Sequence, residues 1–233
     1  MKSIITPIFV IIITFFFPLK SFSHVEHYKN VEKFIMEIFK DGKRIGFNNY
    51  TFSRNGENLI IENKTAFTVS ILGLNAFSIK GSSKETYKNN KLISFKSDSI
   101  QNKKVKFVNL YLDKAKEHYF IKGSSYTGKA DLGIVIGSWW NHRVIQSEKN
   151  ISPISGSINK QTINFIKREK INLYGKDYDT KHFVIILNRL NKDDVKERRY
   201  DVWLDTTTNH ILKVNYSKYG LWEYKLKQVI YSK

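Results

Sequence analysis

Cysteine is absent from the 233-residue chain. Without thiols no disulfide framework can form, so packing alone must stabilise the fold. The same absence excludes thiolate catalysis and the zinc or iron–sulfur sites that depend on cysteine. Proline is almost as scarce, with Pro7, Pro18 and Pro153 the only examples.

The chain also lacks the sequence motifs of common enzyme classes. It has no P-loop, no dinucleotide-binding glycine pattern, no His-Glu-x-x-His and no Gly-x-Ser-x-Gly. We therefore expect no catalytic residues, no cofactor and no metal. Two alternatives stay open. Scattered polar groups around His142 and Glu85, with Asp201 or Asp205, could do acid–base work. His24, as a new N-terminus, could chelate copper together with a further histidine.

The N-terminus has the three parts of a secretory signal peptide. Lys2 gives a positive start, residues 4–17 form an apolar run of 14 residues, and Ser21-Phe22-Ser23 supplies small residues before a cut. A membrane-spanning helix needs about 20 apolar residues, so an uncleaved anchor is the weaker alternative. We expect cleavage after Ser23, export to the bacterial periplasm, and one β-rich domain over residues 24–233.

The formal net charge of +18 could serve nucleic acid or an anionic membrane surface. Export argues against a nucleic-acid partner. Lysine recurs at polar strand positions such as Lys64 and Lys225, which favours a solvated basic surface. An anionic membrane surface remains an alternative partner. We expect the protein to be a monomer.

Alternation with a period of two dominates the remaining sequence. Leu59, Ile61 and Phe67 share one parity, while Glu62 and Lys64 take the other, as in a half-buried strand. Asp41-Gly42 and Asn55-Gly56 separate such runs and suit tight hairpins. The pattern predicts a mainly β fold of about ten strands. A meander of long strands must curl to bury a face, so we expect a strongly curved antiparallel sheet or unclosed β-barrel.

One segment, residues 122–157, breaks this rhythm. It is rich in glycine and serine, yet carries Trp139 and Trp140, and residues 139–145 could form two short helical turns. Such an insertion is typical of a lid or a functional loop, or of a cover for the core. Trp139, Trp140, His142 and Tyr126 are the candidate ligand-binding residues, for an apolar or lipid-like ligand. The alternative for the aromatic residues is ordinary core packing.

Several segments in this order resemble a family of exported bacterial β-rich proteins of unknown function. They are residues 40–47, the run from Glu85 to Ser94, Ser138-Trp139-Trp140, and the hairpin of residues 200–205 and 211–214. That family is similar to the periplasmic lipoprotein-carrier fold group. The resemblance implies an unclosed antiparallel barrel whose apolar concave face is covered by loops or helices. It also implies a lipid-like ligand and no catalytic residues. An interaction protein that contacts envelope partners is the alternative.

Overall fold

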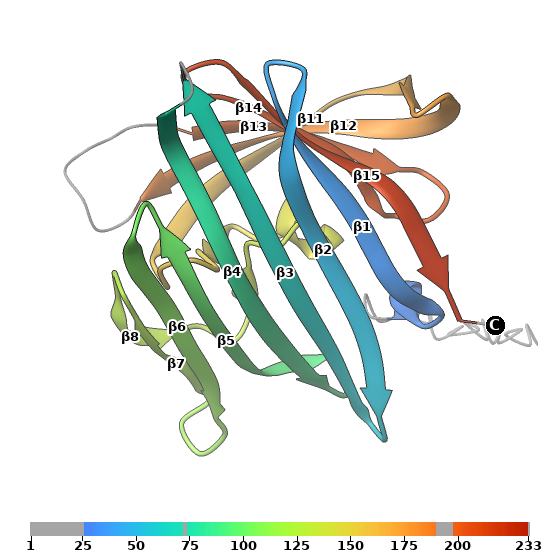
Figure 1. Cartoon of the computed structure of the whole chain (residues 1–233). Coiled ribbons are helices and arrows are strands. Elements are labelled where there is room, and N and C mark those ends of the chain that lie inside the picture. The colour runs from blue at the N-terminus through green and yellow to red at the C-terminus, as the bar shows by residue number, and fades with distance from the viewer. Residues whose placement is uncertain (1–25, 72–73, 190–197, 233) are drawn as a thin grey trace, which may run out of the picture.

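The computed structural model describes residues 26–71, 74–189 and 198–232, and their strands form one curved sheet (Figure 1). All neighbouring strands in it are antiparallel except β9 and β10, which pair in parallel. Fifteen strands lie in these ranges. Their bounds are β1 Val31–Lys40, β2 Lys43–Asn55, β3 Asn58–Ile71, β4 Leu74–Lys88, β5 Lys91–Gln101, β6 Lys104–Asp113, β7 His118–Gly123, β8 Thr127–Ala130, β9 Val135–Ile136, β10 Lys149–Ile151, β11 Ile158–Leu173, β12 Lys176–Arg189, β13 Arg198–Asp205, β14 Ile211–Ser217 and β15 Leu221–Tyr231. Two single 3-10 turns, η1 Glu26–Tyr28 and η2 His142–Ile145, are the helical elements described.

The predicted hairpins are confirmed where the structure describes them. Asp41 and Gly42 both adopt positive φ (49° and 78°) between β1 and β2, and Gly56 does so (57°) between β2 and β3. Asn89 and Asn90 turn the chain in the same left-handed region (48° and 65°) before β5. These residue types accept that conformation at low cost, and so they set the register of the long strands.

The fold class was predicted correctly, but the count of about ten strands was too low. The strands that alternation missed include β8, β9 and β10, which have 4, 2 and 3 residues. Such short strands are too brief to show a period. The 16-residue β11 was missed for another reason. It carries charged residues 167–170 next to a register shift between Phe165 and Lys167, which breaks its alternation.

The sheet nearly closes into a barrel. β1 pairs with β15, and the two edges of the sheet are β8 and β9. Only residues 131–134 connect these edges, so they lie within about 19 Å of each other, because consecutive Cα atoms are 3.8 Å apart. Ser125 N also donates to Ser155 O at 2.9 Å, which ties the β7–β8 turn to the β10–β11 turn. Gly123 permits this approach, since an added Cβ would lie 2.6 Å from Ser155 O.

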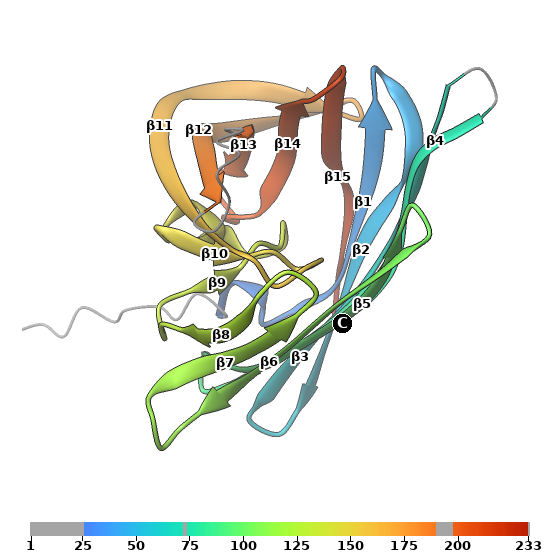
Figure 2. The same ribbon diagram turned by 90° about the vertical axis from the view of Figure 1, so that its left-hand side faces the viewer.

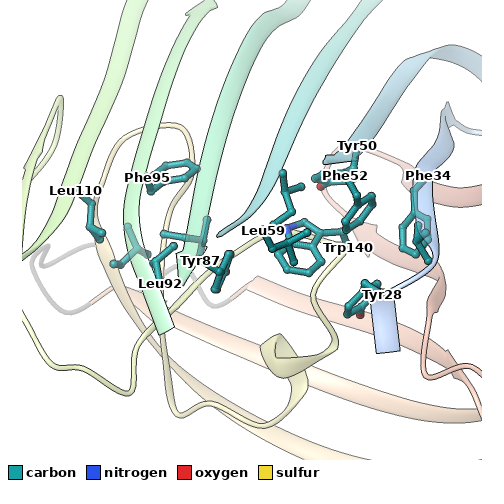
Figure 3. Packing of buried hydrophobic residues seen from close by; sticks show 14 of the residues in the cluster. Tyr28, Phe34, Tyr50, Phe52, Leu59, Tyr87, Leu92, Phe95, Leu110 and Trp140 are labelled. Atoms are coloured by element: carbon teal, nitrogen blue, oxygen red, sulfur yellow. The ribbon is translucent and has the colours of Figure 1, made fainter. Parts of the chain in front are cut away.

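The main core fills one half of the barrel (Figure 3). Trp140 is fully buried at its centre, with ring centroids 5.1 Å from Tyr28, 5.5 Å from Phe52 and 5.8 Å from Tyr87. Inward residues of β1 to β6 surround this group, as period-two burial requires. The segment between β8 and β11 therefore plugs the barrel.

Residues 1–25 lie outside the described residues. They include the predicted leader of residues 1–23, the predicted cleavage site after Ser23, and His24, for which copper binding was an alternative. The expected turn at residues 191–194 also lies outside the described residues. Within the described ranges, no helix is long and apolar enough to cross a membrane.

Candidate functional site

The half of the barrel beyond the plug holds an open cavity of about 1190 Å³. Its mouth is formed by residues that flank the β1–β2, β3–β4, β5–β6 and β14–β15 turns. Its floor is formed by the plug, residues 137–139 and 150–157. The volume slightly exceeds the range of about 300–1,000 Å³ that is usual for small-molecule pockets. The plug therefore divides the barrel into a packed half and a hollow half.

One wall of the cavity is aromatic. Trp139 packs at 5.6 Å from Tyr200 and at 6.3 Å from Tyr224. Tyr200 contacts Tyr216 at 5.3 Å, and Tyr216 stacks on Trp222 at 5.5 Å. Burial raises the pKa of the Tyr224 and Tyr216 hydroxyls well above their ordinary value, so both stay neutral. The ring contacts therefore run without a break from Trp139 at the floor to Trp222 near the mouth.

The lining also has a polar part, whose side chains mostly hydrogen-bond to one another. Asn63 Nδ2 donates to Asn48 Oδ1 at 2.7 Å, and Asn48 Nδ2 donates to Tyr50 OH at 2.9 Å. Near the floor, Asn150 Nδ2 donates to Gln161 Oε1 at 2.7 Å. Ser99 differs, because its buried Oγ has no hydrogen-bond partner within the described ranges. A buried hydroxyl normally has a partner, so Ser99 is a candidate contact for a polar group of a ligand.

The mouth is basic. Six of the lining residues are cationic, Lys40, Lys43, Arg44, Lys106, Arg198 and Lys218, whereas Asp41 is the one acidic residue in the lining that is described. Lys40 contacts Asp41 directly, and this contact holds the pKa of the Asp41 carboxyl below its usual range. The excess of cations gives the entrance a positive potential.

The plug is held by the buried carboxylate of Glu85, which accepts three hydrogen bonds. We call Glu85 and the three donor residues the Glu85 clamp. Ser138 Oγ donates to Glu85 Oε1 at 2.8 Å, and Trp140 Nε1 donates to the same oxygen at 2.9 Å. Tyr87 OH donates to Oε2 at 2.8 Å. Burial raises the pKa of Glu85, and the three donors oppose this shift only in part.

The clamp explains why the two adjacent tryptophans point in different directions. Ser138 and Trp140 are fixed to Glu85 on the core side of the segment. Trp139 lies between them, its backbone N–H donates to Tyr50 OH at 3.2 Å, and its ring packs on the aromatic wall. One tryptophan therefore belongs to the core and its neighbour to the cavity.

A sequence model of the domain of unknown function DUF6134 matches residues 36–227. The chain belongs to this family. The match spans every strand from β2 to β14 and covers Glu85 and its three donors. Two segments that carried the expected family resemblance, the one that begins at Glu85 and Ser138-Trp139-Trp140, thus meet in space at the clamp.

The fold of this DUF6134 chain is similar to that of a solved structure of very different sequence, and two further structures superpose less well. A β-barrel-like protein of the domain of unknown function DUF1849 from Brucella abortus superposes with a TM-score of 0.58 at 9% identity, covering 88% of this chain and 99% of that one. A Bacteroides fragilis protein with a YmcC-like fold, described as exported, gives 0.39 at 9% identity over 87% and 96%. A Parabacteroides distasonis protein described as a lipoprotein gives 0.37 at 8% over 86% and 95%. No curated protein matches the sequence.

The predicted ligand-binding residues of this DUF6134 member do not all line the cavity. Trp139 lines the cavity, but Trp140 is fully buried in the core. His142 is 5% exposed, and its Nδ1 lies 3.0 Å from Tyr28 OH. Tyr126 is half-buried, and its hydroxyl donates to Lys129 O at 2.8 Å on β8. The cavity lining includes Trp139 and not the other three.

The remaining polar candidates also make separate contacts. Asp201 Oδ1 lies 2.9 Å from His182 Nε2, and Asp205 accepts from Thr208 N at 3.3 Å in a turn. Glu85 lies in the clamp. Within the described residues, no group of three or more histidine, aspartate or glutamate side chains could hold a metal ion.

Sequence reasoning missed the clamp, the basic mouth and the polar lining. The signal for the lining was present on β4 and β5. Gly81, Ser83, Ser97 and Ser99 occupy inward positions where a filled barrel would carry large apolar residues. Small polar residues at inward positions indicate a hollow interior.

Proposed function

We propose that the chain is an exported, non-catalytic protein of the bacterial envelope that holds an amphipathic, lipid-like ligand in the cavity. The observation that supports this proposal is the hollow half of the barrel, whose lining combines a cluster of aromatic side chains with polar ones. A protein that needed the barrel only as a scaffold could fill it with side chains. Pockets with a mostly apolar lining and a few fixed polar groups are typical of small-molecule binding.

The lining suggests how such a ligand would lie. Its apolar part would pack on Trp139, Tyr200 and Tyr224, where it gains the free energy of removing apolar surface from water. Its polar part would face the amide lining and the unpartnered Ser99 hydroxyl. A purely apolar ligand would leave the buried Ser99 hydroxyl without a partner, and this favours an amphipathic one.

Export is part of the proposal and rests on the sequence of the N-terminus. The positive start, the short apolar run and the small residues before position 24 support a leader over residues 1–23. Residues 24–233 would then act as one domain in the periplasm.

A fluorescent amphiphile tests the proposal directly. The mature protein is titrated with 1-anilinonaphthalene-8-sulfonate, and the bound probe is then displaced with a lysophospholipid. We expect saturable binding that weakens by about tenfold or more in Trp139→Ala, because a central aromatic contact is lost. Trp203→Ala is the matched control. Trp203 stacks on His182 at 4.5 Å and is not part of the cavity lining. Equal binding by both variants and the wild type would refute the cavity as the site.

A further inference from the structure

The β3–β4 hairpin extends beyond both of its neighbours. β3 pairs with β2 only as far as Phe67, opposite Gly46, and β4 pairs with β5 only from Ile79 onward, opposite Gln101. Residues 68–71 of β3 therefore pair with β4 alone, as Thr68 with Ser78 and Val69 with Phe77 show. Four strand residues span about 13 Å. Figure 2 shows this ribbon projecting past the barrel wall.

The composition of this ribbon does not suit water. Residues 65–79 contain no charged side chain, although 26% of the chain is charged. This is the longest uncharged run beyond the predicted leader. Leu74 is 76% exposed at the end of the ribbon. A two-stranded hairpin alone is marginally stable in water, so an apolar one that projects into solvent suggests a surface that covers it.

The ribbon stands at the mouth of the cavity. In an antiparallel meander, alternate turns lie at the same end, so the β1–β2, β5–β6 and β14–β15 turns share the end of the β3–β4 turn. Asn102 Oδ1 accepts from Ser78 N at 2.7 Å, which places the β5–β6 turn at the base of the ribbon. Val105 and Tyr219 add exposed apolar surface there, at 72% and 89%.

The turns beside the ribbon are basic. Residues 40–44, 101–106 and 216–221 contain Lys40, Lys43, Arg44, Lys103, Lys104, Lys106 and Lys218, and Asp41 is their one acidic residue. A cluster of cations around an apolar tip matches an anionic bilayer, whose headgroups attract lysine and whose acyl region accepts apolar side chains. A second copy of this chain fits less well, because it would bring two basic rims together.

We propose that the mouth end of the barrel docks on an anionic phospholipid bilayer, with the apolar ribbon inserted and the basic turns on the headgroups. The described contact surface comprises the exposed Leu74 and Ala76 of the ribbon with Lys43, Arg44, Lys104 and Val105 of the turns. In this orientation the cavity opens toward the membrane. An amphipathic molecule could then pass between bilayer and cavity without full exposure to water.

Sedimentation with vesicles tests the docking. The mature protein, without added ligand, is mixed with vesicles of phosphatidylglycerol and phosphatidylcholine, or of phosphatidylcholine alone. We expect binding to the anionic vesicles that falls as salt rises. Leu74→Asp should lower the partition coefficient about tenfold or more, because it removes an inserted apolar side chain and adds a charge near the headgroups. Leu132→Asp is the matched control, at a 47% exposed leucine in the link between the sheet edges.

The basic turns are tested by a second pair of variants. Lys43→Ser with Lys104→Ser should weaken binding by about fivefold for each lysine, since each contributes about 1 kcal/mol near an anionic surface. Lys91→Ser with Lys114→Ser is the matched control at the turns of the opposite end. Thermal unfolding of each variant checks that the fold is intact.

Several outcomes would overturn the docking proposal: equal binding to neutral vesicles, equal effects of the test and control variants, or a dimer in solution that Leu74→Asp dissociates in the absence of vesicle binding. The result is separable from the cavity proposal. Vesicle binding that persists in Trp139→Ala, while that variant has lost the fluorescent amphiphile, supports both. Vesicle binding by a protein that holds no amphiphile supports docking alone.

Discussion

Replacing Glu85 by alanine tests how the plug is held. The substitution removes the acceptor of three buried hydrogen bonds, with donor–acceptor distances of 2.8, 2.9 and 2.8 Å from Ser138, Trp140 and Tyr87. Each buried donor left without a partner costs about 1–3 kcal/mol. The alanine variant no longer pays the desolvation cost of a buried carboxyl group, and this offsets part of the loss. We therefore expect a net loss of about 3–5 kcal/mol in the free energy of unfolding.

Glu85→Gln separates hydrogen bonding from charge. The amide oxygen still accepts from Ser138 and Trp140, and the amide nitrogen can donate to the oxygen of Tyr87, so the cost at acidic pH should be about 1 kcal/mol. Burial raises the pKa of Glu85 above 4.5. An acid with a raised pKa holds its proton more tightly in the folded state, so the contribution of Glu85 to the stability of the wild type falls as pH rises above 4.5. The cost of glutamine should therefore shrink with rising pH.

Urea unfolding followed by tryptophan fluorescence measures both effects. Glu62→Ala is the control, since Glu62 pairs with Lys84 at 3.7 Å on the surface, where such a pair contributes little. The clamp would be refuted if Glu85→Ala cost no more than Glu62→Ala. A glutamine cost that grew with pH would refute the raised pKa.

Acid should destabilise the fold, because burial lowers the pKa of His142 and of His210 from 6.5 to about 4. The stability that these two histidines contribute is then complete above pH 6.5 and is lost as pH falls toward 4, by up to about 3 kcal/mol for each histidine. A urea midpoint that falls less with acid in the double glutamine variant than in the wild type would confirm the cause, and equal pH dependence of the two would contradict it. Gly123→Ala should lower the free energy of unfolding by about 2 kcal/mol, since its Cβ would lie 2.6 Å from Ser155 O. Gly133→Ala meets no atom within 4 Å and should cost little, and equal thermal midpoints for the two variants would contradict the close approach.

The curved sheet could be predicted from the sequence because its long strands bury one face each. Leu59, Ile61 and Phe67 of β3 are all buried, as their shared parity predicts. The closing strands could not be found in this way. β8 to β10 are too short for a period, and they are fixed by their place at the sheet edges and the link of residues 131–134.

The candidate site was predicted only in part. Adjacent tryptophans in a glycine- and serine-rich segment drew attention to Trp139 and Trp140, and the structure places only Trp139 in the cavity. Which of the two turns toward the core depends on Glu85, which lies 55 residues before Trp140 in the sequence. Local patterns carry no information about such a contact. The basic mouth was missed because its cations come from separate turns that only the meander brings to one end.

Native mass spectrometry of the mature protein, isolated from its own envelope without detergent, tests the central claim most directly. We predict a bound amphiphile that is released on unfolding and identified by extraction, and that is absent from Ser83→Trp, which fills the cavity from β4. Ligand-free wild-type protein, or equal retention of the bound mass by the filled variant, would contradict the account.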